Sequence, residues 1–86
     1  RIYNGLRQQE NNMKGGILIV KFPNLRAEMA RHGIRVGDVA KTLGLSYSAA
    51  YKKITGHSEF TLSELVIIRK KFFPDKTLDY LFEETA

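Results

Sequence analysis

The sequence has no cysteine and only two histidines, His32 and His57, among its 86 residues. Without thiols there is neither a disulfide framework nor a thiolate metal site, and two imidazoles alone make a poor zinc site. We therefore expect no metal ion and no cofactor. The lack of cysteine also fits a reducing compartment, and we predict a location in the bacterial cytoplasm or nucleoid.

Long hydrophobic runs are also missing, because no apolar run exceeds the four residues of Ile17–Val20. A membrane-spanning helix needs about 20 apolar residues, and the core of a secretory signal needs at least about 7. We expect no membrane association and no targeting segment.

Catalytic patterns are absent as well. No Ser/His/acid arrangement has the spacing of a known triad, no glycine-rich loop could hold a phosphate, and no pair of acids is placed for a pocket. A chain of 86 residues also supports only one modest core. We predict a protein that is not an enzyme and has no evident small-molecule substrate.

Acidic residues are scarce in the middle of the chain. Residues 29–58 carry five Lys/Arg against Asp38 alone, a net charge of +4, whereas residues 59–86 carry four bases and six acids, a net charge of −2. A polyanion would be attracted to the middle third, and nucleic acid is the commonest polyanionic partner of a small basic domain. Ordinary solubility charge remains the alternative explanation.

The first part of the chain is predicted to be an arm. Residues 1–16 are polar and show no sustained hydrophobic period, and residues 17–22 are apolar and precede Pro23, which predicts a short strand. We therefore divide the chain into an arm, residues 1–22, and a helical domain, residues 23–86.

A second hypothesis treats residues 1–19 as translated leader. Lys14-Gly15-Gly16 can be encoded by a purine-rich ribosome-binding sequence, and Val20 can be encoded by a GTG start codon. Met13 is an equally possible start, so the nucleotide sequence or the mass of the native N-terminus is needed to decide.

Five helices are predicted after Pro23 from polar N-caps, apolar residues at helical spacing and glycines that end helices. They run from an Asn24 cap to His32, from Val36 to Leu43, from a Ser46 cap to Thr55, from a Thr61 cap to Phe73, and from a Thr77 cap to Phe82. The fourth is the most hydrophobic, and we expect it at the centre of the core. The predicted fold class is a compact all-α domain.

The connection between the second and third predicted helices is very short, because Gly44 ends one and Ser46 begins the next. So tight a turn forces the two axes to cross steeply. In that geometry the earlier helix supports the later one, whose outward side can enter a DNA major groove about 12 Å wide.

The outward side of this third helix carries hydrogen-bonding groups and no acid. With Ala50 and Ile54 facing inward, it consists of Tyr47, Ser48, Tyr51, Lys52 and Thr55. A merely solvated helix usually favours Glu, Lys and Ala, so this composition indicates contact with an anion. The alternative is that both tyrosines pack on neighbouring helices and Lys52 is only solvated.

Three segments have the pattern of a known DNA-binding family: Asp38–Ser46, which contains Ala-x-x-Leu-Gly-Leu-Ser, Lys53–Gly56, and Ser58–Glu64. Through them, residues 25–82 resemble the lambda-repressor-like, Cro-type (XRE-like) helix-turn-helix family, especially small regulators of phages and prophages of Gram-positive bacteria. The resemblance covers about two thirds of the chain.

This resemblance implies a five-helix lambda-repressor-like domain that binds double-stranded DNA. It places Tyr47, Ser48, Tyr51 and Lys52 at base-reading positions, and Ser46 and Thr55 against the phosphate backbone. Many members open the second helix with Thr-Gln, where this chain has Arg35-Val36. Arg35 either replaces the missing phosphate contact of that glutamine or is merely exposed.

The sequence therefore predicts a transcriptional regulator, such as a repressor, that reads about 4 to 6 base pairs per domain and pairs as a homodimer on a palindrome. Dimerisation would use either residues 17–22 or an aromatic C-terminal surface, although in so small a domain such aromatics are more often core. These aromatics are Phe72, Phe73, Tyr80 and Phe82. The alternative function is a protein-interaction module: an antitoxin, anti-repressor or replication adaptor.

Overall fold

The computed structural model describes residues 21–84, and within that range the chain forms five helices and no strand. They are α1 (Pro23–His32), α2 (Val36–Leu43), α3 (Tyr47–Thr55), α4 (Leu62–Phe72) and α5 (Leu78–Leu81). The prediction of an all-α fold is confirmed. The predicted arm and strand lie outside the described residues except at Lys21 and Phe22, which are not in a strand.

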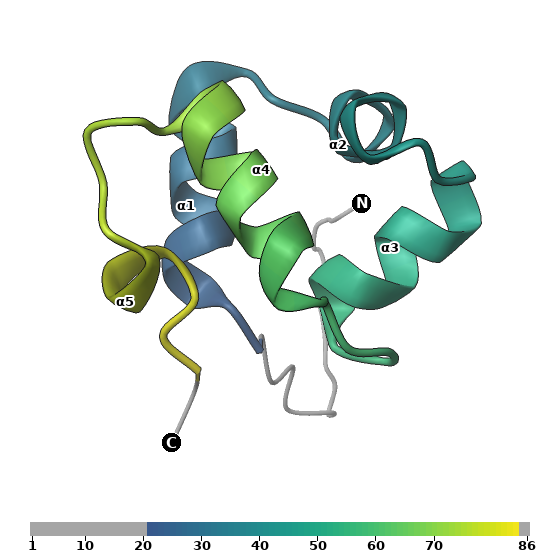
Figure 1. Ribbon diagram of the computed structural model, residues 1–86. Helices are drawn as coiled ribbons and strands as arrows, with labels where there is room; N and C mark the ends of the chain where they lie inside the picture. The colour runs from purple at the N-terminus through teal and green to yellow at the C-terminus, as the bar shows by residue number, and fades with distance from the viewer. Residues whose placement is uncertain (1–20, 85–86) are drawn as a thin grey trace, which may run out of the picture.

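The helices pack in two groups that meet at α4. In Figure 1, α4 crosses in front of α1, with α5 beside them, while α2 and α3 lie on the other side. α2 contacts both α3 and α4, and α5 contacts both α1 and α4. The α2–α3 pair is therefore supported from one side and open on the other.

Three helices begin at the hydroxyl caps that the sequence predicted. The side chains of Ser46, Thr61 and Thr77 each accept a hydrogen bond from the N–H three residues later, at 3.1, 3.2 and 3.0 Å. The Glu64 carboxylate also accepts from the Thr61 N–H at 2.9 Å, which completes a capping box. These caps satisfy N–H groups that have no partner within the helix.

The prediction that Asn24 is the N-cap of α1 is wrong. Asn24 does not cap the helix, because α1 already begins at Pro23, a residue that favours the first helical position. The Asn24 amide instead donates a hydrogen bond to the backbone oxygen of Tyr80, 2.9 Å away. Asn24 therefore ties α1 to α5.

The core draws on every helix. Its members are Phe22, Leu25, Met29, Val39, Ile54, Ile68, Phe73 and Leu81. Phe22, which the sequence analysis assigned to the arm, is 6% exposed and lies 5.8 and 5.6 Å, ring to ring, from Phe60 and Phe82. The division of the chain at residue 22 stays a prediction, but Phe22 packs with the helices.

Helix α4 buries less of its hydrophobic surface than its composition suggested. Ile68 is its one fully buried residue, whereas Leu62 is 70% exposed and Ile67 is 42% exposed. α4 still contributes Ile68 to the core and contacts both α2 and α5, so it lies between the two groups of helices. Its hydrophobic residues lie on several sides of the helix, and only some of them face the contacting helices α2 and α5.

The C-terminal aromatic residues are core residues and do not form one free surface. Phe73 is 1% exposed, and Phe72, Tyr80 and Phe82 are half-buried against the core cluster. Of the two interpretations, the structure supports core packing over a dimer surface. The other proposed dimer surface, residues 17–22, lies mostly outside the described range.

A buried carboxylate also joins α1 to α5. Glu28 is 3% exposed, and its Oε2 accepts hydrogen bonds from the Tyr80 hydroxyl at 2.8 Å and from the Arg31 guanidinium at 2.7 Å. The Tyr80 hydrogen bond, with support from Arg31, lowers the pKa of Glu28 below its ordinary value. The sequence analysis did not identify this contact.

Candidate nucleic-acid interface

Helices α2 and α3 form the tightly connected pair that the sequence predicted. Gly44 ends α2 with φ of 71°, and the N–H of Leu45 donates to the Ala40 oxygen at 2.9 Å. Only Leu45 and the cap Ser46 then separate the turn from α3. Figure 1 shows α2 almost end-on while α3 runs across the view, so the two axes cross steeply.

The inward side of α3 is fixed by two apolar residues. Ala50 and Ile54 are 0% and 1% exposed, as the helical period predicted. Since α3 packs against α2 through this side, the opposite side faces away from the domain.

The outward side of α3 presents two tyrosines, a serine and a lysine. Tyr47 is 61% exposed and Tyr51 is 48% exposed, and Ser48 and Lys52 are also exposed. The alternative that both tyrosines pack beneath neighbouring helices is therefore wrong. We call these four residues the tyrosine surface.

The two tyrosine rings lie against each other along the helix. Their planes differ by 11° and their centroids are 6.3 Å apart. This is a stacked arrangement, which follows from the i, i+4 spacing because such residues are neighbours on one side of a helix. The pair limits the freedom of both side chains while they remain exposed.

The two residues predicted to hold phosphate already use their hydroxyl groups within the chain. Ser46 caps α3, and the Thr55 hydroxyl donates to the Tyr51 oxygen at 2.8 Å and lies 2.9 Å from His57 Nδ1. Ser46 is exposed and Thr55 is half-buried. Both lie at the ends of the tyrosine surface, and their contact with phosphate stays a prediction.

Arg35 stands at the N-cap of α2 and is exposed. Its backbone N–H donates to the Asp38 carboxylate at 2.8 Å, which satisfies the start of the helix. Among residues 21–84, no ion pair engages its guanidinium. Its role as a replacement phosphate contact is untested.

Two adjacent lysines on α3 have different environments. Lys52 is exposed, whereas the Lys53 side chain is 17% exposed, and its ammonium lies 3.1 Å from Glu64 Oε1 and donates to the Glu59 oxygen at 2.8 Å. The Thr61 N–H and then Lys53 lower the pKa of Glu64. The two lysines are neighbours in the sequence, which cannot show that Lys53, and not Lys52, forms the ion pair with Glu64.

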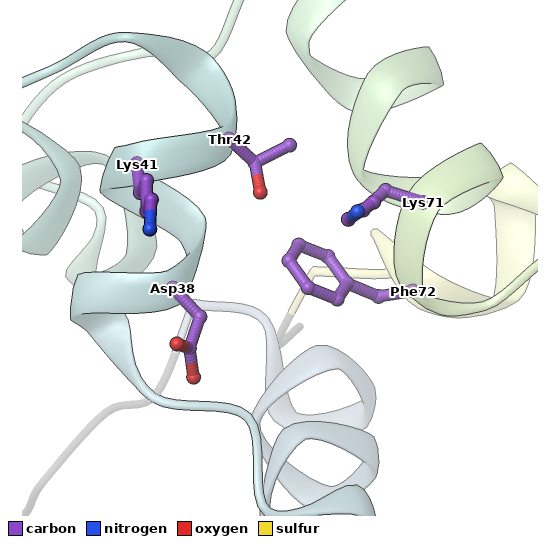
Figure 2. A pocket seen from close by; sticks show the side chains of 5 residues that line it. All are labelled: Asp38, Lys41, Thr42, Lys71 and Phe72. Carbon is purple, nitrogen blue, oxygen red and sulfur yellow. The ribbon is translucent and has the colours of Figure 1, made fainter.

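A shallow groove lies elsewhere, between α2 and the end of α4. It has a volume of about 390 Å³ and is lined by Asp38, Lys41, Thr42, Lys71 and Phe72. Figure 2 shows Thr42, Lys71 and Phe72 extending toward the same space. No residue of the tyrosine surface lines it, so the two features are separate.

Among residues 21–84, no three histidine or carboxylate side chains are grouped to hold a metal ion. No helix in the same range is long and apolar enough to cross a membrane.

Comparison with known proteins identifies the family of this chain. Residues 18–86 match the family model of the BetR domain, and this stretch contains all five helices. No curated protein and no solved structure matches the chain. The match identifies a small helical domain family, and the Cro-type identity that the sequence motifs resemble stays a prediction.

Proposed function

This chain belongs to the BetR domain family, and on that premise we propose that it is a sequence-specific, double-stranded DNA-binding regulator. The proposed type is the Cro-like, lambda-repressor-like transcriptional regulator of a phage or prophage. It reads the major groove with residues 46–55 and gains specificity as a homodimer on a palindromic site. The proposal includes no catalytic step and no cofactor.

One observation carries the proposal: α3 presents an exposed side without acids while α2 supports it from behind. Tyr47, Ser48, Tyr51 and Lys52 all point away from the core and all carry hydrogen-bonding groups. A helix with its side chains fits a major groove about 12 Å wide. The family match, which fits a helical regulatory domain, supports the same function.

A second candidate function is binding to a protein. Exposed tyrosines are among the residues that contribute most at protein interfaces, and Leu62, 70% exposed, adds apolar surface at the start of α4. The basic, acid-free composition of the tyrosine surface favours DNA, because a partner protein does not require it.

The test is the salt dependence of binding to duplex DNA. Each phosphate contact releases counterions from the DNA. The logarithm of the association constant should therefore fall with the logarithm of the salt concentration, with a slope of about −0.9 per contact. We expect a steep slope for the full chain, and we expect Lys52→Ala to make it shallower by about one unit with weaker binding. Lys70→Ala, at the far end of α4, removes the same charge and should leave the slope unchanged.

Opposite results would favour the protein-binding function. They are DNA binding that does not depend on salt, no DNA binding even at low salt, or equal effects of Lys52→Ala and Lys70→Ala on the slope. Fluorescence anisotropy of a labelled duplex measures all three, and circular dichroism confirms that each variant is folded.

A further inference from the structure

We propose that Tyr47 and Tyr51 make the DNA surface select thymine, by packing their rings against thymine 5-methyl groups in the major groove. This inference rests on the proposed function and adds the base that the tyrosine surface reads. It also assigns the recognition of thymine to the aromatic rings of the two tyrosines and not to their hydroxyl groups.

The first step is the exposure of the pair. Tyr47 and Tyr51 are 61% and 48% exposed, the two exposed large aromatics in the described part of the chain. Exposed aromatic surface is unfavourable in water, and its removal from water stabilises a complex by about 25 cal/mol per Å². A partner that covers these rings with apolar atoms therefore gains affinity.

The second step is what duplex DNA offers to such a surface. The base edges in the major groove carry hydrogen-bond donors and acceptors and a few aromatic C–H groups, and the 5-methyl group of thymine is the one aliphatic group among them. A ring carbon cannot satisfy a purine N7 or an exocyclic amine, and covering such a group without a hydrogen bond costs free energy. Of the four bases, thymine therefore suits the aromatic rings.

The third step is spacing. The ring centroids are 6.3 Å apart, and successive base pairs are about 3.4 Å apart along the duplex. The ring separation is about twice this rise, so the two rings can face methyl groups about two base pairs apart. Their planes differ by 11°, so both rings present nearly the same orientation to the groove.

The neighbouring residues complete the selection. Ser48 and Lys52 are exposed on the same side of α3 and supply the hydrogen bonds and charge that apolar contact lacks. The short Ser48 side chain offers little apolar surface to a methyl group, so Ser48 provides a control for the tyrosines.

The experiment removes single methyl groups from a bound site. Duplexes bound by the full 86-residue chain are selected from a random pool, and each thymine in the selected site is replaced in turn by uracil. Uracil keeps the same hydrogen-bonding groups and lacks only the 5-methyl group. We expect binding about fourfold weaker at one or two positions, the effect of one buried methyl group.

The tyrosine variants assign each methyl group to its ring. In Tyr47→Ala and Tyr51→Ala, the uracil effect should disappear at the position that each ring covers, whereas Tyr47→Phe and Ser48→Ala should keep it. Both tyrosines are exposed, so their replacement should leave the fold intact, and thermal unfolding checks this.

Three outcomes would overturn the inference. Uracil has no effect at any position, the effect persists in both alanine variants, or the selected sites contain no thymine. In each case the chain still binds DNA, and the proposed function stands. Failure to select any duplex would overturn the proposed function and the thymine inference together.

Discussion

Tyrosine has opposite roles at two places in this domain. At the junction of α1 and α5, the Tyr80 hydroxyl donates to the buried Glu28 carboxylate and holds two helices together. On α3, Tyr47 and Tyr51 are exposed and stack only on each other. The comparison shows that packing decides the role of these tyrosines: the hydroxyl of Tyr80 is used within the chain, whereas the rings of Tyr47 and Tyr51 remain exposed.

The largest expected effect comes from comparing a buried and an exposed residue on one helix, α4. Ile68→Ala should lower the free energy of unfolding by about 2–5 kcal/mol, because Ile68 is fully buried and its loss leaves a cavity. Leu62→Ala, on the exposed side of α4, should change it by less than about 0.5 kcal/mol. Urea unfolding measures both. Similar losses would show that the two sides of α4 are not distinct.

The turn between α2 and α3 should give the next largest effect. Gly44 has φ of 71°, so Gly44→Ala should cost about 1–2 kcal/mol through the backbone alone, since nothing lies within 4 Å of an added Cβ. Gly37→Ala, inside α2 and equally unobstructed, should instead stabilise the fold by up to about 1 kcal/mol. Thermal unfolding compares the two. A stabilising Gly44→Ala would contradict the strained turn.

The adjacent lysines should separate stability from binding. Lys53→Ala should lower the free energy of unfolding by about 1 kcal/mol, because it breaks contacts with Glu64 and the Glu59 oxygen. Lys52→Ala should leave stability unchanged and weaken DNA binding. Denaturant unfolding and anisotropy are needed on both variants. If both lose stability equally, Lys52 also has a structural partner.

The smallest effect is expected in acid. The Tyr80 hydrogen bond lowers the folded pKa of Glu28 below 4.5, its ordinary value, so the unfolded chain binds this proton more readily. The contribution to stability is therefore complete above about pH 4.5 and is lost as the pH falls through the lowered folded pKa. Tyr80→Phe should reduce this acid-dependent loss, measured by unfolding at several pH values.

The control is Tyr47→Phe, the same substitution in the exposed pair. It should leave the acid dependence of stability as in the unchanged chain, because Tyr47 faces outward and stacks on Tyr51. An equal change in both variants would show that the hydrogen bond to Glu28 is not the cause.

The sequence predicted the features that depend on nearby residues. The caps Ser46 and Thr61 bond to N–H groups three residues away, and Gly44 ends its helix through local geometry, so each leaves a short pattern. The outward side of α3 follows from Ala50 and Ile54 by helical period alone. The four members of the tyrosine surface could therefore be predicted, whereas Thr55, predicted with them, is half-buried. Contact of this surface with DNA stays a prediction.

Distant contacts explain what the sequence could not show. Asn24 is a residue type that often caps helices, but its amide donates a hydrogen bond to the backbone oxygen of Tyr80, 56 residues later. The sequence does not show that the fold brings the Tyr80 hydroxyl to Glu28, or that Phe60 and Phe82 pack against Phe22, which was assigned to the arm. Each depends on a partner that only the folded chain supplies.

The stacked tyrosine pair also gives the protein a built-in optical signal. The sequence contains no tryptophan and four tyrosines, so ultraviolet emission comes from tyrosine alone, with no indole to mask it. Two of the four emitters, Tyr47 and Tyr51, lie on the surface proposed to meet the bases. A ligand that covers this surface should change the emission directly, so its arrival can be followed without attaching a dye.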